Sequence, residues 1–414
     1  MKRRDFIKTA GGATVVSTFL QNDLLNGTIA FSQERDSGGQ GVRFIEPFDG
    51  AILHRRSGEP VLGLTETGTL KIKVSGTTDR PVELMIFFHE GIHGEGQLVP
   101  IHQTGNEFRA EVELRERFNT LQLFDAKTKN AIDGATSLVI WLKESFPRYR
   151  FQIDDNSFWL RDIHQQNYQS LFDCFYLAML RDFHKKYNSK FALNCFYSTP
   201  ERDFDMSMFS DRYKSEFEDN ADWLRLTFHA ENEFPDNPYQ NATPEKLAAD
   251  FDQTAAEIQR FAGMAYSAPA IIHWGTIRPE CYQTLYDRGV RSLSGYFIPL
   301  ENGQWLVNFQ LPDAQSRYLM NHDAWFDKKS RLIFSKLSIV CNTVSLAETI
   351  PTIQRSMANP NTAEVMDLLT HEQYFWPFYQ NYYADHADRL DAVLRYVTEF
   401  GYKPVWHNDG FYSV

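Results

Sequence analysis

The hydrophobic pattern changes its period near residue 148, and this change constrains the fold more than any other feature of the 414-residue chain. Between residues 41 and 147, apolar and polar side chains alternate, as in 70–74 (LKIKV) and 108–114 (FRAEVEL). Alternation with a period of two is typical of strands that have one buried face. About seven such segments, separated by turn residues, predict an immunoglobulin-like all-β sandwich.

From residue 148 to 414, short apolar segments alternate with amphipathic ones. The clearest helix is predicted over residues 243–263, with Thr243 as N-cap, Pro244 in the first turn and Gly263 at the C-terminus. Seven or eight strand-then-helix units predict a parallel α/β sheet that closes as a barrel, and an open doubly wound sheet is the alternative. We expect strands over 148–155, 190–197, 223–229, 270–273, 291–297, 332–341, 365–371 and 403–406, and further helices over 173–187, 279–289, 345–358 and 379–401.

The N-terminus predicts export. Residues 1–30 place the Arg3-Arg4 pair and Lys8 before a short apolar stretch, in an order that resembles the twin-arginine signal peptide. We therefore expect a periplasmic or secreted protein in which residues 31–40 form a linker. No later stretch approaches 18 apolar residues, so no membrane span is expected in the mature protein. The four cysteines are expected to be buried free thiols, and a disulfide is the alternative.

The charge and the aromatic content of the chain limit the kinds of molecule that it is expected to bind. The formal net charge of −12 makes nucleic acid an unsuitable partner for bulk electrostatic binding, and none is expected. Aromatic residues make up 14% of the chain. A large core explains this content, and so does a cleft that stacks sugar rings; the sequence leaves both open.

Polar residues follow four of the predicted strands, at the point where each strand ends. They are Asp154-Asp155, His229, His273 and His371. Because the carboxyl ends of parallel strands meet at one edge of a sheet, we expect these side chains to share a site. Imidazole and carboxylate are ordinary ligands of a divalent metal such as Zn²⁺, which lowers the pKa of a bound water. The pattern therefore predicts a metal-dependent hydrolase.

Taken in order, the motifs of residues 148–414 resemble those of the polysaccharide deacetylase family, as a divergent member. Asp154-Asp155 is similar to the family's Asp-Asp motif, and the segment from His229 to Glu233 is similar to its H-x3-H motif, with Glu in place of the second His. The resemblance implies a distorted (β/α)7 barrel. It also implies Asp154 as the catalytic base and Asp155, His229 and Glu233 as metal ligands.

Two later segments extend the resemblance. Residues 271–275 (IIHWG) lie where the family has an Arg-Pro-Pro-Tyr-Gly loop. The family's arginine is absent, His273 is a substitute metal ligand, and the backbone N–H of Trp274 is the implied oxyanion donor. Residues 368–372 (LLTHE) are similar to the closing Leu-His motif, which implies His371 as general acid, with Glu372 as an added catalytic carboxylate.

The leading hypothesis is a carbohydrate deacetylase that removes N- or O-acetyl groups from a glycan with a divalent metal, Zn²⁺ being expected. A metal-independent glycoside hydrolase with paired carboxylates is one alternative. A catalytically lapsed barrel that only binds glycans is the other. Four aromatic residues are expected to line the sugar cleft: Trp274, Trp325, Tyr374 and Phe375.

Overall fold

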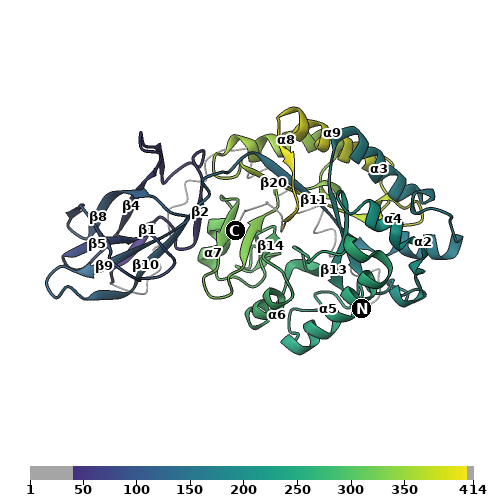
Figure 1. The fold of residues 1–414 in the computed structure, drawn as a ribbon, viewed down its shortest axis with the longest axis horizontal. Helices are drawn as coiled ribbons and strands as arrows, with labels where there is room; N and C mark the ends of the chain where they lie inside the picture. The colour runs from purple at the N-terminus through teal and green to yellow at the C-terminus, as the bar shows by residue number, and fades with distance from the viewer. Residues whose placement is uncertain (1–40, 408–414) are drawn as a thin grey trace.

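The protein is described by a computed structural model that covers residues 41–407. It has a β-rich part at one end of its long axis and a larger part with helices and parallel strands at the other (Figure 1). The described residues form several sheets and eight α-helices, which confirms the mixed α/β class. The predicted signal peptide over 1–30 and the linker over 31–40 lie outside the described residues.

The β-rich part contains two sheets that share one apolar core. In β4 the residues Leu70, Ile72 and Val74 are buried and alternate with more exposed ones, as the period of two predicts. The immunoglobulin-like arrangement stays a prediction. The first sheet contains β1 (Arg43–Glu46), β3 (Val61–Leu64), β4 (Leu70–Thr77), β7 (Ile101–Thr104) and β8 (Glu107–Leu114), and the second contains β2 (Ala51–Leu53), β5 (Val82–Phe87), β6 (Gln97–Val99), β9 (Phe118–Asp125) and β10 (Ala131–Trp141).

The second of these sheets continues beyond residue 147, where the sequence predicts a domain boundary. Strand β17 (Ala324–Phe326) pairs with β2 through Trp325 and Ala51, and β18 (Ile333–Lys336) and β14 (Ser292–Gly295) follow it. Eight strands thus form one sheet that joins the two parts of the chain, and β14 and α7 (Asp313–Leu319) lie between them in Figure 1.

A separate parallel sheet forms the centre of the larger part. Its hydrogen-bonded order is β13-β12-β11-β20-β19, with β21 pairing to β11, so the carboxyl ends of its strands meet at one edge. The ladder ends at β13 and β19 in the described residues, and a closed barrel stays a prediction. The strands are β11 (Arg148–Asn156), β12 (Phe191–Phe196), β13 (Leu224–Ala230), β19 (Ile339–Val340), β20 (Val365–His371) and β21 (Lys403–Pro404).

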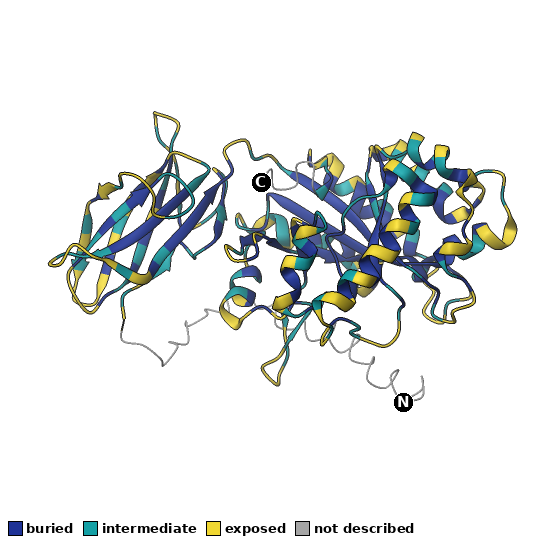
Figure 2. Cartoon of the chain, turned by 60° about the horizontal axis from the view of Figure 1, so that its bottom comes forward, coloured by how far each residue is buried: buried dark blue, intermediate teal, exposed yellow. Residues whose placement is uncertain are grey.

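Helices cover this sheet with their buried faces inward and their exposed faces outward (Figure 2). Helix α5 (Pro244–Ala262) begins and ends as predicted: the Thr243 side chain accepts a hydrogen bond from the Lys246 N–H, and Gly263 is the C-cap. In the described residues no helix has both the length and the apolar character that a membrane span requires. The remaining helices are α2 (Phe158–Gln166), α3 (Phe175–Tyr187), α4 (Lys214–Asp219), α6 (Tyr282–Asp287), α8 (Leu346–Ala358) and α9 (His386–Glu399).

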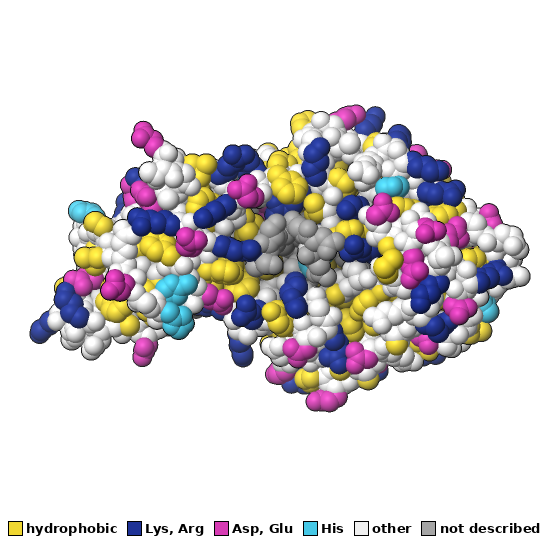
Figure 3. Space-filling view, viewed as in Figure 1, with side chains coloured by type: hydrophobic (Ala, Val, Ile, Leu, Met, Phe, Trp, Pro, Cys, Tyr) yellow, Lys and Arg dark blue, Asp and Glu magenta, His cyan; other side chains and the backbone are white. Residues whose placement is uncertain are grey.

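The structure also settles several local predictions. All four cysteines are buried and free, which confirms the expectation of free thiols. The strand expected over 270–273 is wrong, because this segment leads into a short helical turn, η5 (His273–Gly275). The strand expected over 332–341 is interrupted, and its halves join two different sheets as β18 and β19. Basic and acidic side chains are interspersed over the face shown in Figure 3.

Candidate metal centre

Three side chains converge at the carboxyl edge of the parallel sheet. Asp155 lies near the end of β11, His229 lies near the end of β13, and His273 opens the turn η5. Asp155 Oδ1 lies 3.3 Å from His229 Nε2 and 3.5 Å from His273 Nδ1, and the two imidazole nitrogens are 3.1 Å apart. All three residues are buried. We call Asp155, His229 and His273 the ligand triangle.

The dimensions of the ligand triangle fit a tetrahedral metal ion. Bonds of about 2.0 to 2.1 Å to such an ion place its ligand atoms about 3.3 Å from one another. Asp155 Oδ1 is buried and has no hydrogen-bond partner among the described residues. A buried acceptor without a donor is costly unless something else compensates it. The oxygen and nitrogen donors therefore fit a divalent cation, with a tetrahedral position left for water or substrate.

The backbone fixes which nitrogen of His273 faces the triangle. The Nε2–H of this imidazole donates to the backbone carbonyl of Glu233 at 3.2 Å, which leaves the Nδ1 lone pair directed toward Asp155 and His229. Burial, together with the neighbouring His229, lowers the pKa of His273 to about 3. The ring is therefore neutral over the physiological range, as a metal ligand must be.

Asp155 reaches the triangle through an unusual backbone conformation. Its φ is +61°, in the left-handed region that non-glycine residues seldom adopt. The register between β11 and β12 shifts at the same place, between Ile153 and Asn156. Burial alone would raise the pKa of Asp155, and the imidazoles of His371, His273 and His229 outweigh it, so the pKa lies below its usual range. Asp155 is thus ionised and held in a strained backbone conformation.

Asp154 lies beside the triangle with different partners. Its Oδ1 accepts a hydrogen bond of 2.6 Å from Asn194 Nδ2, and its Oδ2 lies 3.8 Å from His229 Nε2. Burial raises the pKa of Asp154, although His229, His371 and Asn194 each lower it. A carboxylate with a raised pKa, next to a metal site, is suited to accept a proton.

His371 lies opposite Asp154 in the adjacent strand. The two residues are register partners in the β11–β20 ladder, so their side chains emerge at the same level of the sheet. His371 Nδ1–H donates to Asn342 Oδ1 at 2.8 Å, which fixes the ring orientation. The imidazole is half-buried, as a proton donor facing a substrate needs to be.

Glu233 is not part of the ligand triangle, which corrects the expectation from the H-x3-H resemblance. Its carboxylate accepts a hydrogen bond of 3.0 Å from Gln373 Nε2, so it links the loop after β13 to the turn after β20. His273 completes the triangle instead. The segment after β13 does not continue as a helix, and the spacing of four residues therefore does not bring His229 and Glu233 to the same point.

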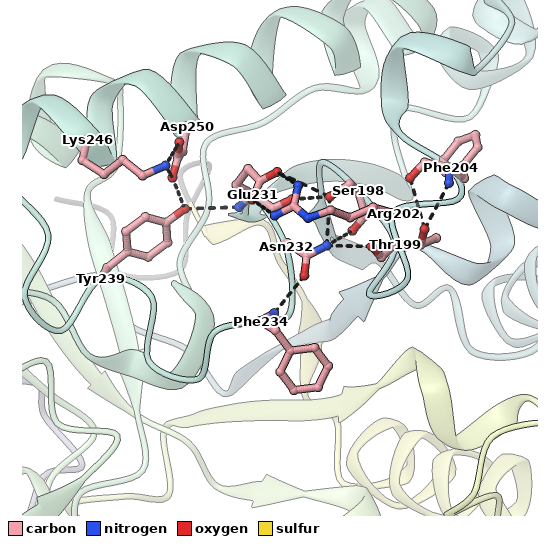
Figure 4. Close-up of polar contacts among 10 residues, drawn as sticks. All are labelled: Ser198, Thr199, Arg202, Phe204, Glu231, Asn232, Phe234, Tyr239, Lys246 and Asp250. Carbon is pink, nitrogen blue, oxygen red and sulfur yellow. Dashed lines mark hydrogen bonds and ion pairs between the residues drawn. The ribbon is translucent and has the colours of Figure 1, made fainter. Parts of the chain in front are cut away.

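A polar network holds this loop in place (Figure 4). Asn232 Nδ2 donates to the Thr199 carbonyl at 2.6 Å and to Ser198 Oγ at 2.9 Å, and its Oδ1 accepts from the Phe234 N–H at 2.9 Å. Arg202 and Glu231 form a two-point ion pair at 2.7 and 2.9 Å. The Phe234 ring points away from the network and is 43% exposed. These contacts with the segment after β12 therefore hold in place the loop whose Glu233 carbonyl orients His273.

Glu372 has a structural role, which corrects its assignment as a catalytic carboxylate. Its two oxygens accept hydrogen bonds from the backbone N–H groups of Ser157, Phe158 and Trp159 at 2.6 to 3.0 Å, and from Trp376 Nε1 at 2.9 Å. The carboxylate is fully buried and caps the N-terminus of α2, which the Ser157 side chain does not cap. Burial raises its pKa to about 7. With four donors in place, it has no free lone pair directed at a substrate.

The four aromatic residues expected in the cleft lie in different environments. Trp274 is 37% exposed and its ring centroid is 5.9 Å from that of His273. Tyr374 is half-buried with its ring 6.1 Å from His371. Phe375 is instead buried against Tyr176 and His386, and Trp325 is buried in the sheet that joins the two parts, where its Nε1–H donates to the Asp49 carbonyl. Placing these two in a sugar cleft is wrong.

Asn194 and Asn342 contact the two proposed proton-transfer groups, and neither was expected from the sequence. Asn194 lies in the middle of the apolar strand β12 (FALNCF), and Asn342 directly follows β19 and Cys341. A polar amide inside an apolar strand must find a partner, since its burial is otherwise costly. Asn194, as the one polar residue inside this apolar strand, was therefore a signal in the sequence that a buried polar partner lies nearby.

No protein-family model matches the sequence, and neither does any curated protein. Among solved structures, the chain is similar to a family 4 acetyl xylan esterase from Clostridium thermocellum, in complex with a cobalt ion. The two sequences are 14% identical, the TM-score is 0.30, and the alignment covers 62% of this chain and 86% of the esterase. A TM-score of 0.30 marks a distant likeness. The chemistry inferred for this chain depends on its own side-chain geometry.

Proposed function

We propose that this protein is a divalent-metal-dependent hydrolase that removes acetyl groups from a carbohydrate. The observation that carries the proposal is the ligand triangle, with separations of 3.1 to 3.5 Å between its donor atoms. Asp154 lies beside the triangle, and His371 is its register partner on the adjacent strand, at the same level of the sheet. The arrangement supports hydrolysis at a single polarised acyl carbon.

Asp155, His229 and His273 are the residues that would hold the cation, for which Zn²⁺ is our first choice. A divalent cation at such a site lowers the pKa of a coordinated water and polarises the acyl oxygen. Asp154 removes a proton from the attacking water as the oxygen–carbon bond forms. His371 donates a proton to the departing nitrogen or oxygen as the acyl bond breaks, so the products are acetate and a free amino or hydroxyl group.

The conformation of the turn after Ile272 supports a role for its backbone in stabilising the negative charge that develops on the acyl oxygen during hydrolysis. Trp274 has a φ of +65° and Gly275 a φ of +56°, so both are in the left-handed region. A Cβ at Gly275 would lie 2.6 Å from Val307 Cγ1, which excludes larger residues there. We propose the Trp274 backbone N–H as the oxyanion donor and its exposed ring, with Tyr374, as a sugar contact.

The capped state of Glu372 disfavours the glycoside hydrolase. That alternative needs two carboxylates on opposite sides of a sugar bond, one of which donates a proton. Glu372 faces four hydrogen-bond donors instead of the edge where Asp154 ends. The acyl-transfer chemistry needs no second free carboxylate, because His371 is the acid.

The test measures metal content and two products on the same purified protein. We expect stoichiometric metal by elemental analysis, and acetate release from N-acetylglucosamine oligomers or O-acetylated xylo-oligomers. Chelation is expected to abolish the release, and added Zn²⁺ to restore it. New reducing ends that survive chelation would instead establish the glycoside hydrolase. Glycan binding without either product would establish a binding protein.

A further inference from the structure

The side chain of Asn194 is a buried polar group in the sheet that the proposed chemistry does not explain. It is fully buried in β12, between Leu193 and Cys195, which are also fully buried. Burying an amide costs free energy unless its donors and acceptor are all paired. The hydrogen-bond partners of the Asn194 side chain therefore indicate its role.

Asn194 connects three adjacent strands. Its Nδ2 donates to Asp154 Oδ1 at 2.6 Å and to Gln152 Oε1 at 3.1 Å, both on β11. Its Oδ1 accepts from the hydroxyl of Thr227, its register partner on β13. An ionised Asp154 carboxylate only accepts hydrogen bonds, so it requires the nitrogen of the amide to face β11, and the oxygen then accepts from the Thr227 hydroxyl on β13. The relay fixes the amide in one orientation.

The relay also distinguishes the two oxygens of Asp154. The terminal torsion of an aspartate is broad and roughly two-fold, so an unrestrained carboxylate can rotate. A short hydrogen bond to an ionised oxygen is among the stronger ones and opposes this rotation. With Oδ1 held by Asn194, Oδ2 is the oxygen turned toward His229 Nε2, 3.8 Å away, at the ligand triangle.

We propose that Asn194 is a positioning residue, which holds Asp154 so that Oδ2 accepts the proton from the attacking water. The inference rests on the proposed function, because it takes Asp154 as the base. The hydrogen bonds of the Asn194 side chain go to Asp154, Gln152 and Thr227, and none goes to the ligand triangle. The effect of Asn194 on turnover passes through Asp154, where a displacement of about 1 Å is enough to lower a rate on the order of 100-fold.

A double-mutant cycle tests this route. We expect Asn194→Ala to lower kcat for acetate release from N-acetylglucosamine oligomers on the order of 10- to 100-fold, with KM and the dissociation constant for Zn²⁺ unchanged. In an Asp154→Asn background the same substitution is expected to have no further effect on kcat, because the group it positions is already gone. Effects on kcat that multiply would overturn the proposal.

Two further variants separate positioning from general destabilisation. Asn119 is an equally buried asparagine in the β-rich part, and its side chain bonds to the backbone near Glu116. The substitution Asn119→Ala is expected to lower stability and to leave kcat unchanged. If Asn194→Ala does not fold, Thr227→Val removes the hydroxyl that donates to Asn194 Oδ1 and helps to hold the amide in place, and kcat is expected to fall in the same direction. An unchanged kcat in the folded variant would overturn the proposal.

The cycle also distinguishes the two levels of inference. If the wild-type protein binds no metal and releases no acetate, the proposed function fails and the role of Asn194 fails with it. If the wild-type protein is active and the cycle is multiplicative, the proposed function stands and the role of Asn194 alone is overturned.

Discussion

Two groups of buried charged residues in this molecule differ in how completely they are paired. The first is the ligand triangle with Asp154. The second, which we call the junction cluster, contains His54, Arg56, Arg148, Asp323 and Glu364, and it lies where the β-rich part meets the larger part. Apart from Arg56, which is partly exposed, both groups are removed from water, and both contain carboxylates beside basic side chains.

In the junction cluster the charged side chains have partners in the cluster or in the backbone. Arg56 Nε donates to Glu364 Oε2 at 2.8 Å, Arg148 Nη1 donates to the Phe146 carbonyl at 2.9 Å, and Asp323 Oδ2 accepts from the Val365 N–H at 3.2 Å. The cavity that the cluster lines is about 10 Å³, which is room for one water at most.

The ligand triangle leaves an acceptor open. Asp155 Oδ1 accepts no hydrogen bond in the described part of the chain, although Asp154 Oδ1 next to it does. Complete pairing is typical of a structural cluster, and convergence with an open acceptor is typical of a site for a ligand. Substitutions should therefore affect the two groups differently.

The largest expected effect concerns the triangle. Asp155→Asn keeps the shape of the side chain but removes the anionic ligand, so we expect stoichiometric metal to be lost and kcat/KM to fall on the order of 1,000-fold or more. The metal-free protein should also unfold more easily, by about 1 kcal/mol, because the amide does not keep the attraction of the carboxylate to the neighbouring imidazoles. Elemental analysis and denaturant unfolding check both parts. Retained metal and activity would contradict the assignment.

The junction cluster should respond in the opposite way. Glu364→Ala leaves the buried guanidinium of Arg148 and that of Arg56 without their carboxylate, and we expect unfolding to become easier by about 3 kcal/mol. Metal binding should not change. Glu111→Ala breaks an exposed pair with Lys71 and is the matched control, with an expected loss of about 0.5 kcal/mol or less. A Glu364 variant as stable as this control would remove the contrast between the two groups.

The elements that could be predicted from sequence are those with local signals. Helix α5 has its own N-cap, Thr243, and its own C-terminal Gly263. Helix α2 was not predicted, because its cap is Glu372, more than 200 residues away in the chain. The pairing of β17 with β2 was likewise missed, since nothing near Trp325 in the sequence indicates a partner near Ala51. Local signals cannot report contacts made by distant segments.

The same distinction applies to the candidate site. Asp155, His229 and His273 could be predicted because each follows or ends an apolar run, and parallel strands bring such ends together. The sequence predicts Glu233 as a ligand because it lies four residues after His229. That spacing brings two side chains together only in a helix, and this segment is not helical. Whether a carboxylate lies in the site or caps a helix, as with Glu372, depends on the positions of backbone N–H groups that the sequence does not specify.

Glu372 gives a prediction that links the two kinds of role. Glu372→Gln replaces one acceptor oxygen with an NH₂ group that cannot accept the N–H groups of α2, and we expect a loss of about 2 kcal/mol in unfolding free energy. Because Glu372 adjoins His371 and the capped helix follows Asp155, kcat should fall as well. Thr243→Ala removes the cap of α5, away from the site, and should cost about 1 kcal/mol with kcat unchanged. A Glu372 variant with normal kcat would separate the cap from the chemistry.

The smallest effect concerns the protonation of the junction cluster. Burial lowers the pKa of His54 to about 4, with Glu364 opposing and Arg56 and Arg148 assisting the shift. In the unfolded chain the pKa returns to about 6.5, so between pH 6.5 and 4 the unfolded state binds a proton that the folded state does not. Stability contributed by neutral His54 is complete above pH 6.5 and is lost as the pH falls toward 4.

This difference can be isolated by comparison with His54→Gln, whose amide oxygen can still accept the Arg56 N–H that bonds to His54 Nδ1. Between pH 7 and pH 5 the wild-type protein should lose roughly 1 to 2 kcal/mol of unfolding free energy that the variant retains. Urea unfolding at the two pH values measures both slopes. Parallel slopes would mean that His54 is protonated equally in the folded and unfolded chain. Burial in the junction cluster would then have no effect on the protonation of His54.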